Sequence, residues 1–339
     1  MRPTKYNREE LLKNAKMIKF VCKFCGSKIE TDSKNLDCKA CGALMAVTIL
    51  PYLENYKHNK NSKKMKNEKS LFEESVVSSE NYFMDIIFPI LSIQKIELEN
   101  IQKLMNFQFN SGNNLAPEQL KQFVINKKFL ATDFFQKNQV DLTDLQLTGL
   151  DLPIYFNGLL PQGKRIMIVA QDPLRNEEGF IKMNANISHE MIIWTPFSYQ
   201  EKNNDNYLYW NIIGYISEKS SQVYITDLNK IWFKPNKNNL TIRKDLKANL
   251  YLNILEKEVN NYFKPDIIFA FGKKAFNELK FLKTEARVYY ILHPSRTAAR
   301  YRPEYFADFK TDNENLKFDY KNLNDLYKSK INNFINKSE

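Results

Sequence analysis

The fold of this chain is decided by the stretch Arg165-Ile166-Met167-Ile168-Val169-Ala170, which runs directly into Gln171-Asp172-Pro173-Leu174-Arg175. The first part is a short apolar run with β-branched residues, as expected for a strand that is buried on both faces. The second part is polar and contains a proline, so we expect the strand to end there. Because parallel sheets bind ligands at the carboxyl ends of their strands, Gln171 and Asp172 are candidate site residues.

Three more apolar runs with strand character follow further along the chain. They are Val223–Thr226, Asp266–Phe271 and Val288–Leu292. Helical patterns lie between them, at Leu208–Lys219 and Leu246–Asn261. Strands that alternate with helices indicate crossover connections and a mostly parallel sheet. We therefore expect residues 151–339 to form a three-layer α/β/α domain with a mostly parallel central sheet.

Further polar residues come directly after these runs. Asp227 follows the run that begins at Val223, and His293-Pro294-Ser295 follows the last one. An aromatic residue, Phe197, lies between the first two runs. We expect Asp172, Phe197, Asp227 and His293 to converge at the edge where parallel strands end, around one cavity.

The composition favours a basic protein that binds a polyanion and argues against a membrane-spanning or secreted one. The chain has 339 residues, enough for two or three units, and its 50 Lys and Arg exceed its 39 Asp and Glu to give a net charge of +11. This excess suits a polyanion such as DNA, although many basic proteins bind none. The chain has no apolar window long enough to span a membrane and no secretory signal. We expect a cytoplasmic protein with DNA as a partner and no membrane contact; the sequence does not identify any protein partner.

All four cysteines lie in a short N-terminal segment, as Cys22-x-x-Cys25 and Cys38-x-x-Cys41. Two such pairs can complete a tetrahedral zinc site, and the metal supplies folding energy that so short a segment lacks. We expect residues 1–50 to form a zinc ribbon with structural Zn²⁺; an iron–sulfur cluster or redox thiols are the alternatives. The ribbon could contact DNA, bind a protein or brace the fold.

Two regions separate the ribbon from the α/β domain. Residues 51–70 are polar and basic without periodicity, which indicates a linker. Residues 71–150 favour helices: Leu98, Ile101 and Met105 recur at helical spacing, and Pro117 is suited to the start of a helix. We interpret this region as helices that pack on the next domain or join the ribbon to it.

The strand-end motifs resemble those of the uracil-DNA glycosylase superfamily over residues 150 to 310. Gln171-Asp172-Pro173 is similar to its water-activating motif, and His293-Pro294-Ser295 to its His-Pro-Ser motif. Val223–Asp227 with Lys230 and Pro235 resembles a segment of the iron–sulfur type within the superfamily, and Phe271–Ala275 its strand–Gly–Lys–Ala turn.

The resemblance implies a role for each motif. Cleavage of an N-glycosidic bond places positive charge on the sugar and negative charge on the departing base. Asp172 would stabilise the sugar cation and orient water, and His293 would donate to the base O2, with backbone N–H groups near Gln171 assisting. Phe197 would stack on a base that has left the duplex.

Structural alternatives stand beside these roles. Asp172-Pro173 could begin a turn and cap a helix. His293-Pro294-Ser295 could form a strand-to-helix corner, and Phe197 could belong to the core.

Two departures from the family concern the base. Asp227 stands where the uracil enzymes carry Asn; an ionised carboxylate only accepts hydrogen bonds, so it would repel uracil O4 and accept from the cytosine amine. Leu174 stands where a Tyr excludes substituents at the base C5. Both changes favour a cytosine-type base, with room at C5. Alternatively, Asp227 caps the next helix, or Thr226 or Asn229 reads the base.

Two further departures concern the cluster and the DNA backbone. Ile231 replaces the Cys that follows the Lys in the iron–sulfur type, so no cluster is expected in this domain. Where an apolar wedge follows His-Pro-Ser in the family, this chain carries Arg296, Thr297 and Ala298, and then Arg300. We expect Ser295, Arg296 and Arg300 to contact DNA.

Three functions follow as hypotheses. The first is a DNA glycosylase for base excision of a modified, C5-substituted cytosine, in antiviral defence against modified viral DNA. The second is a uracil-excising repair glycosylase. The third is a non-catalytic nucleic-acid-binding module that keeps the fold. Because the chain lacks the glycine-rich loops that bind nucleotide phosphates, a nucleotide-handling α/β fold has little support.

Overall fold

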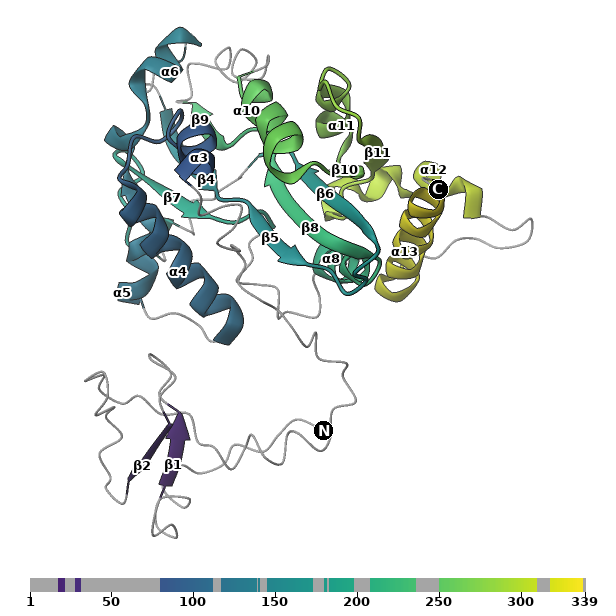
Figure 1. Ribbon diagram of the computed structural model, residues 1–339, viewed down its shortest axis with the longest axis horizontal. Helices are drawn as coiled ribbons and strands as arrows, with labels where there is room; N and C mark the ends of the chain where they lie inside the picture. The colour runs from purple at the N-terminus through teal and green to yellow at the C-terminus, as the bar shows by residue number, and fades with distance from the viewer. Residues whose placement is uncertain are drawn as a thin grey trace. The chain divides into compact units, whose positions relative to one another are not determined.

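The computed structural model describes residues 18–21, 28–31, 80–111, 117–138, 140, 145–172, 180–181, 183–197, 208–235, 250–309 and 318–337 (Figure 1). The chain divides into two compact units, Met1–Asn67 and Glu68–Glu339. In the first unit, strands β1 (Ile18–Val21) and β2 (Lys28–Thr31) pair antiparallel. The four cysteines of the expected zinc ribbon, like the linker 51–70, lie outside the described residues.

The second unit begins with short helical elements and a second, smaller sheet. Its elements up to residue 151 are α3 (Glu80–Tyr82), η1 (Phe83–Ile87), α4 (Lys95–Ser111), α5 (Pro117–Leu120), η2 (Lys121–Phe123), β3 (Val124–Asn126), η3 (Lys127–Phe129), α6 (Thr132–Lys137) and β4 (Leu145–Asp151). Those that follow are β5 (Ile154–Asn157), β6 (Lys164–Ala170), β7 (Glu190–Trp194), α8 (Leu208–Glu218), β8 (Ser220–Asp227), β9 (Ile231–Pro235), α10 (Leu252–Lys257), η5 (Glu258–Phe263), β10 (Ile267–Phe271), α11 (Lys273–Leu279), β11 (Arg287–Ile291), η6 (Arg296–Tyr301), α12 (Arg302–Tyr305), η7 (Ala307–Phe309) and α13 (Tyr320–Asn336).

The central sheet has the strand order β11-β10-β6-β8-β5. The first four strands are parallel, and β5 pairs antiparallel with β8 at the edge. Every residue of β10 and the last five of β6 are buried, which explains their continuous apolar character. The expected α/β class and mostly parallel central sheet are confirmed.

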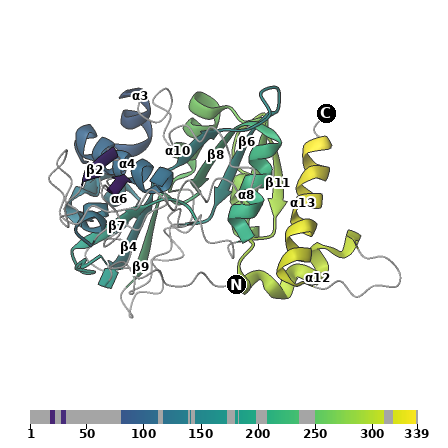
Figure 2. The same cartoon turned by 90° about the horizontal axis from the view of Figure 1, so that it is seen from below.

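Helices cover both faces of this sheet (Figure 1 and Figure 2). On one face, Phe263 of η5 packs against Tyr224 of β8, with ring centroids 5.1 Å apart. On the other face, Phe334 of α13 stacks on Tyr289 of β11 at 4.5 Å, and α13 lies beside α8. The sheet is therefore the middle of three layers, as expected.

The second sheet has the order β3-β7-β4-β9. Strand β3 and all but the last residue of β4 fall within residues 71–150, where we expected helices, so that expectation was wrong for these segments. The stretch Leu145-Gln146-Leu147-Thr148 alternates apolar and polar residues, which is the pattern of a strand with one buried face. The pairing of β4 with β7 and β9 gives this short segment the partners that make it a strand.

The helical elements before residue 150 belong to the same compact unit as the α/β domain. Their apolar residues Ile86, Ile90, Leu98 and Ile101 are buried in the core. Among the described helices, none is long and apolar enough to cross a membrane.

Candidate functional site at the strand ends

The carboxyl ends of four parallel strands lie side by side at one edge of the central sheet. Ala170, the last residue of β6, is the register partner of Asp227, the last residue of β8. On the other side of β6, Phe271 of β10 pairs with Ile291 of β11. Asp172 follows two residues after β6 and His293 two residues after β11, so the strand order brings these segments to a common edge.

Backbone hydrogen bonds join the segments that follow β6 and β8. The N–H of Leu228 donates to the carbonyl of Ala170 at 2.9 Å, and the N–H of Asn229 donates to that of Gln171 at 3.0 Å. The amide Nε2 of Gln171 donates to the carboxylate Oδ2 of Asp172 at 2.7 Å. The position of the Asp172 carboxylate is thus coupled to the loop that carries Asp227.

Strand alternation determines which face each side chain occupies. Ile225 of β8 is the register partner of Ile168 in β6, and Ile168 is that of Phe269 in β10, so all three side chains lie on the face of the sheet that α13 covers. Asp227 is two residues from Ile225 and therefore lies on the same face. Phe271 is two residues from Phe269 and lies on that same side. Thr226 and Tyr224 lie on the opposite face, toward η5.

Gly272 allows the turn after β10 to pass beside His293. Its φ is +104°, a backbone conformation that L side chains rarely adopt, and its N–H donates to the carbonyl of Ile291 at 2.8 Å. A Cβ built on Gly272 would lie 3.8 Å from the Cβ of His293, which is ordinary contact. The glycine is therefore needed for its backbone conformation and not for space.

Phe197 places an aromatic ring next to His293. Its ring centroid is 6.0 Å from that of the imidazole, 5.5 Å from Phe271 and 5.2 Å from Tyr209 of α8, on which it stacks. Its φ of 60° is unusual for a residue with a side chain, and its carbonyl accepts from Nε1 of Trp210 at 3.3 Å. Backbone strain of this kind is often found at functional sites.

The imidazole of His293 is held largely out of water. Burial lowers the pKa of His293 below its ordinary value of 6.5, and the carboxylate of Asp172 opposes this by favouring the charged form. A neutral imidazole carries one N–H that can donate a hydrogen bond. The interaction also shows that Asp172 lies close enough to His293 to influence its charge.

The structure thus brings five of the expected site residues to one edge of the sheet: Gln171, Asp172, Phe197, Asp227 and His293. Of these, Asp227 is buried, and the other four are partly exposed. The burial of Asp227 excludes its ordinary role as an exposed helix cap, and β9 rather than a helix follows it.

The residues expected to contact DNA lie after His293. The carbonyl of Ser295 accepts from the N–H of Ala298 at 3.3 Å and from Nη2 of Arg302 at 3.4 Å. Arg296 begins η6, and the exposed Arg300 lies with its guanidinium 4.7 Å from the ring of Tyr301. Leu174 lies outside the described residues, as does the side chain of Arg296.

Sequence reasoning missed two residues that lie directly behind this edge. Glu258 is fully buried and contacts Lys230, while Tyr82 reaches the same carboxylate from α3. The burial of Glu258 could have been predicted from the sequence. It follows the apolar Ile254 and Leu255 by four and three residues, which places it on the same buried face of a helix. No pattern indicated that Tyr82 would meet it.

Comparison with known families agrees with this geometry. Residues 158–317 match the family described as the Uracil DNA glycosylase superfamily. This segment of the chain is therefore a domain of that superfamily, and the resemblance noted over residues 150 to 310 is confirmed. No curated protein and no solved structure matches the chain. Membership in the superfamily supports a DNA glycosylase-type function, with DNA as the partner.

Proposed function

We propose that this protein is a DNA glycosylase that hydrolyses the N-glycosidic bond of an extruded, C5-substituted cytosine. The observation that carries the proposal is the grouping of Phe197, His293 and Asp172 at the strand ends, beside Asp227. A carboxylate can stabilise the sugar cation, a neutral donor can stabilise the departing base, and an aromatic face can hold the base by stacking.

In the proposed reaction, the bond between the sugar C1′ and the base nitrogen breaks, and its electron pair leaves with the base. The oxygen of a water molecule forms the new bond to C1′, and the proton that the water loses is taken up by the departing base, so the products are a C1′ hydroxyl and a neutral free base. The carboxylate of Asp172 stabilises the positive charge on the sugar and orients the water. The N–H of neutral His293 donates to the base O2, where negative charge develops.

Phe197 serves as the stacking platform for the extruded base. Its ring is already fixed between Tyr209, Phe271 and His293, so little side-chain freedom is lost when a base binds. Stacking on an aromatic ring tolerates any base, and therefore it contributes affinity without selecting the base.

Selection of the base is assigned to Asp227 and Leu174. An ionised Asp227 accepts a hydrogen bond from the exocyclic amine of cytosine and repels the O4 of uracil. Leu174 stands where the family carries a Tyr, and we propose that its shorter side chain admits a substituent at C5. Because cytosines substituted at C5 occur in modified viral DNA, we propose a role in antiviral defence.

The test is incubation of the full chain with oligonucleotides that each carry one base: uracil, cytosine, 5-methylcytosine or 5-hydroxymethylcytosine. Mass analysis identifies the released base, and alkali cleavage reports abasic sites. We expect release of the 5-substituted cytosines. Release of uracil with the 5-substituted cytosines left intact would instead identify a uracil-excising repair enzyme.

The Asp172→Asn variant separates an enzyme from a binding module. It removes the negative charge but keeps the shape of the side chain, so we expect release to fall at least about 100-fold while DNA binding remains. If the wild-type chain binds DNA but releases no base from any oligonucleotide, the protein is a non-catalytic nucleic-acid-binding module.

We also propose that Cys22, Cys25, Cys38 and Cys41 bind one structural Zn²⁺. The spacing of the two pairs supports a tetrahedral site, and strands β1 and β2 pair on either side of the first pair. All four ligand positions are then filled by protein, so this zinc has no part in the proposed reaction.

A further inference from the structure

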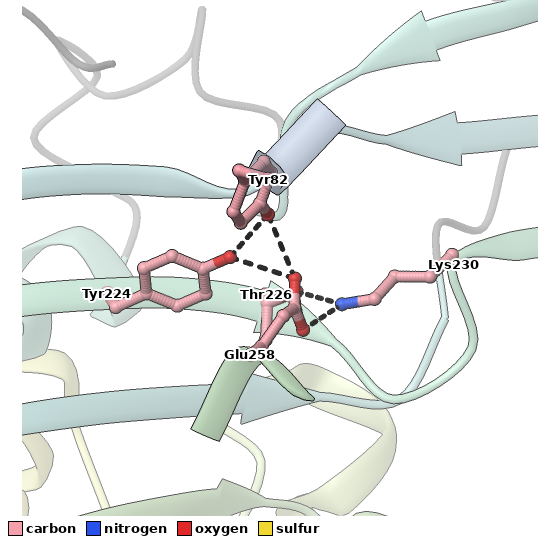
Figure 3. Close-up of polar contacts among 5 residues, drawn as sticks. All are labelled: Tyr82, Tyr224, Thr226, Lys230 and Glu258. Carbon is pink, nitrogen blue, oxygen red and sulfur yellow. Dashed lines mark hydrogen bonds and ion pairs between the residues drawn. The ribbon is translucent and has the colours of Figure 1, made fainter. Parts of the chain in front are cut away.

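Glu258 places a carboxylate in the interior of the domain, behind the strand-end site (Figure 3). Its side chain is 0% exposed. Oε1 accepts from the hydroxyl of Tyr224 at 2.8 Å and from that of Tyr82 at 3.1 Å, and Thr226 lies 3.4 Å from both carboxylate oxygens. The ammonium of Lys230 forms an ion pair with Oε2. We call these five residues the Glu258 cluster.

The hydroxyls in this cluster act as donors. Burial and the nearby Glu258 carboxylate raise the pKa of both Tyr82 and Tyr224 well above its ordinary value. The two hydroxyl oxygens also lie 2.6 Å apart, and each hydroxyl carries one proton, so these two protons are shared among the contacts of the tyrosines with each other and with Oε1. A buried carboxylate needs this number of donors and an opposite charge, because an unpaired charge is costly in the interior.

The cluster holds both ends of the segment that runs from Asp227, the last residue of β8, to Asn229 in the loop that follows. Thr226 precedes Asp227 by one residue, and Lys230 follows it by three. Between these two anchors, the N–H groups of Leu228 and Asn229 bind the carbonyls of Ala170 and Gln171. A single carboxylate therefore restrains the loop from behind, while the backbone of the loop restrains the segment that leads to Asp172.

We propose that Glu258 and Lys230 are positioning residues for the strand-end site, and that Tyr82 completes them from outside the family domain. This inference rests on the proposed function for the identity of the reaction. The pair contacts neither the sugar nor the base. It acts through the loop after β8, which sets where Asp227 and Asp172 stand.

Tyr82 gives the proposal a consequence for domain organisation. It belongs to α3, upstream of the family match that begins at residue 158. Its ring is 0% exposed and its hydroxyl bonds to the cluster. The segment around α3 is thus part of the machinery that positions the site.

The Glu258→Gln variant tests the positioning role in the full chain. It keeps the shape of the side chain but leaves Lys230 without its countercharge. We expect kcat for release of the preferred base to fall by about tenfold or more, with KM nearly unchanged, because small misplacement of catalytic groups is costly. The milder Tyr82→Phe removes one hydroxyl, and we expect a smaller fall in kcat of about threefold.

Tyr262→Phe is the matched control. The ring of Tyr262 contacts that of Tyr82 at 5.1 Å, but its hydroxyl donates to Asp85, outside the cluster. We expect Tyr262→Phe to keep the wild-type kcat. If Glu258→Gln and Tyr82→Phe lower the melting temperature yet keep the wild-type kcat well below it, the cluster only stabilises the fold and the proposal is wrong.

A second measurement does not depend on activity. The pKa of His293, followed by NMR and assigned with a His293→Gln variant, reports how close Asp172 stands, because the Asp172 carboxylate raises this pKa. We expect a lower His293 pKa in Glu258→Gln and in Tyr82→Phe, and no change in Tyr262→Phe. An unchanged pKa in all three folded variants overturns the positioning role. Absence of base release by the wild-type chain overturns only the proposed function.

Discussion

The ring of Phe197 lies with its centroid 6.0 Å from that of His293, and the two planes are inclined at 43°. The two residues are far apart in the chain, and they meet because Phe197, three residues after β7, packs on Phe271 of β10, next to the end of β11. Their proximity places an aromatic ring beside a group that can donate a hydrogen bond, which is the pairing that the proposed base-binding role uses.

Replacement of Phe197 by Leu tests the stacking platform. Leu keeps an apolar contact with Phe271 but has no π-face, so we expect kcat/KM for base release to fall by about 10-fold or more, in line with the energy of base–aromatic stacking. Steady-state kinetics with the preferred oligonucleotide measures this. Phe281→Leu is the control, since this ring is 71% exposed in the turn after α11. If the two variants have equal activity, Phe197 is not the residue on which the base stacks.

The activity should depend on pH through His293. Burial lowers the pKa of His293 below 6.5, and only the neutral imidazole is proposed to act, so its required form predominates above that lowered pKa. We expect the rate to decline at low pH, with the midpoint of that decline below 6.5. The pH profile of kcat measures this, and the His293→Gln variant should lose that limb. A decline centred above 6.5 would contradict the assignment.

Asp227→Asn should change the choice of base. The amide that replaces the carboxylate can donate to the O4 of uracil, whereas the carboxylate can only accept. We expect the ratio of uracil to cytosine-type release to rise by at least about tenfold, which corresponds to one hydrogen bond gained or lost. Competition between two labelled oligonucleotides gives the ratio directly. If the ratio does not change, Asp227 does not select the base and another residue does.

Gly272→Ala should lower stability through the backbone. The φ of +104° is unfavourable for alanine, although the added Cβ finds only ordinary contact at 3.8 Å, so we expect a loss of about 1–3 kcal/mol. Urea unfolding monitored by fluorescence measures it. Gly214→Ala in α8 is the opposite control, because nothing lies within 4 Å of its Cβ position, and alanine should stabilise the helix by about 0.5–1 kcal/mol.

Zinc should bind in a one-to-one ratio with the chain. Elemental analysis of the purified protein is expected to find zinc, and the Cys22→Ser/Cys38→Ser variant should lose it because each pair then keeps one thiolate. Base release measured on this variant tests whether the metal serves the reaction, and we expect it to persist. Iron in place of zinc would favour the alternative cluster.

The sequence allowed the central sheet to be predicted because its strands are continuous apolar runs. The runs that end at Ala170 and Phe271 have no polar interruption, and such a run reads as a buried strand without knowledge of its neighbours. The edge strand β5 and the short strand β3 carry weaker patterns and depend on their partners, β8 and β7. These pairings are tertiary, so local sequence did not indicate them.

In the candidate site, too, some residues could be predicted from the sequence, whereas other contacts depend on the tertiary structure. Asp172, Asp227 and His293 could be selected because each directly follows a buried strand. The contact of Phe197 with His293 depends on a loop whose backbone adopts positive φ at a residue other than glycine, which no local pattern indicated. Likewise, the meeting of Tyr82 with Glu258 joins residues far apart in sequence, and only the packing of α3 against η5 brings it about.

Strand β8 belongs to the central sheet and β9 to the smaller one, and only residues 228–230 connect them. A link of three residues spans at most about 11 Å, so neither sheet can swing far from the other while the link stays intact. Lys230, the last residue of the link, is moreover tied to Glu258. The end of β8 that carries Asp227 therefore lies at a short covalent connection between the two sheets, so a shift of one sheet against the other would displace Asp227.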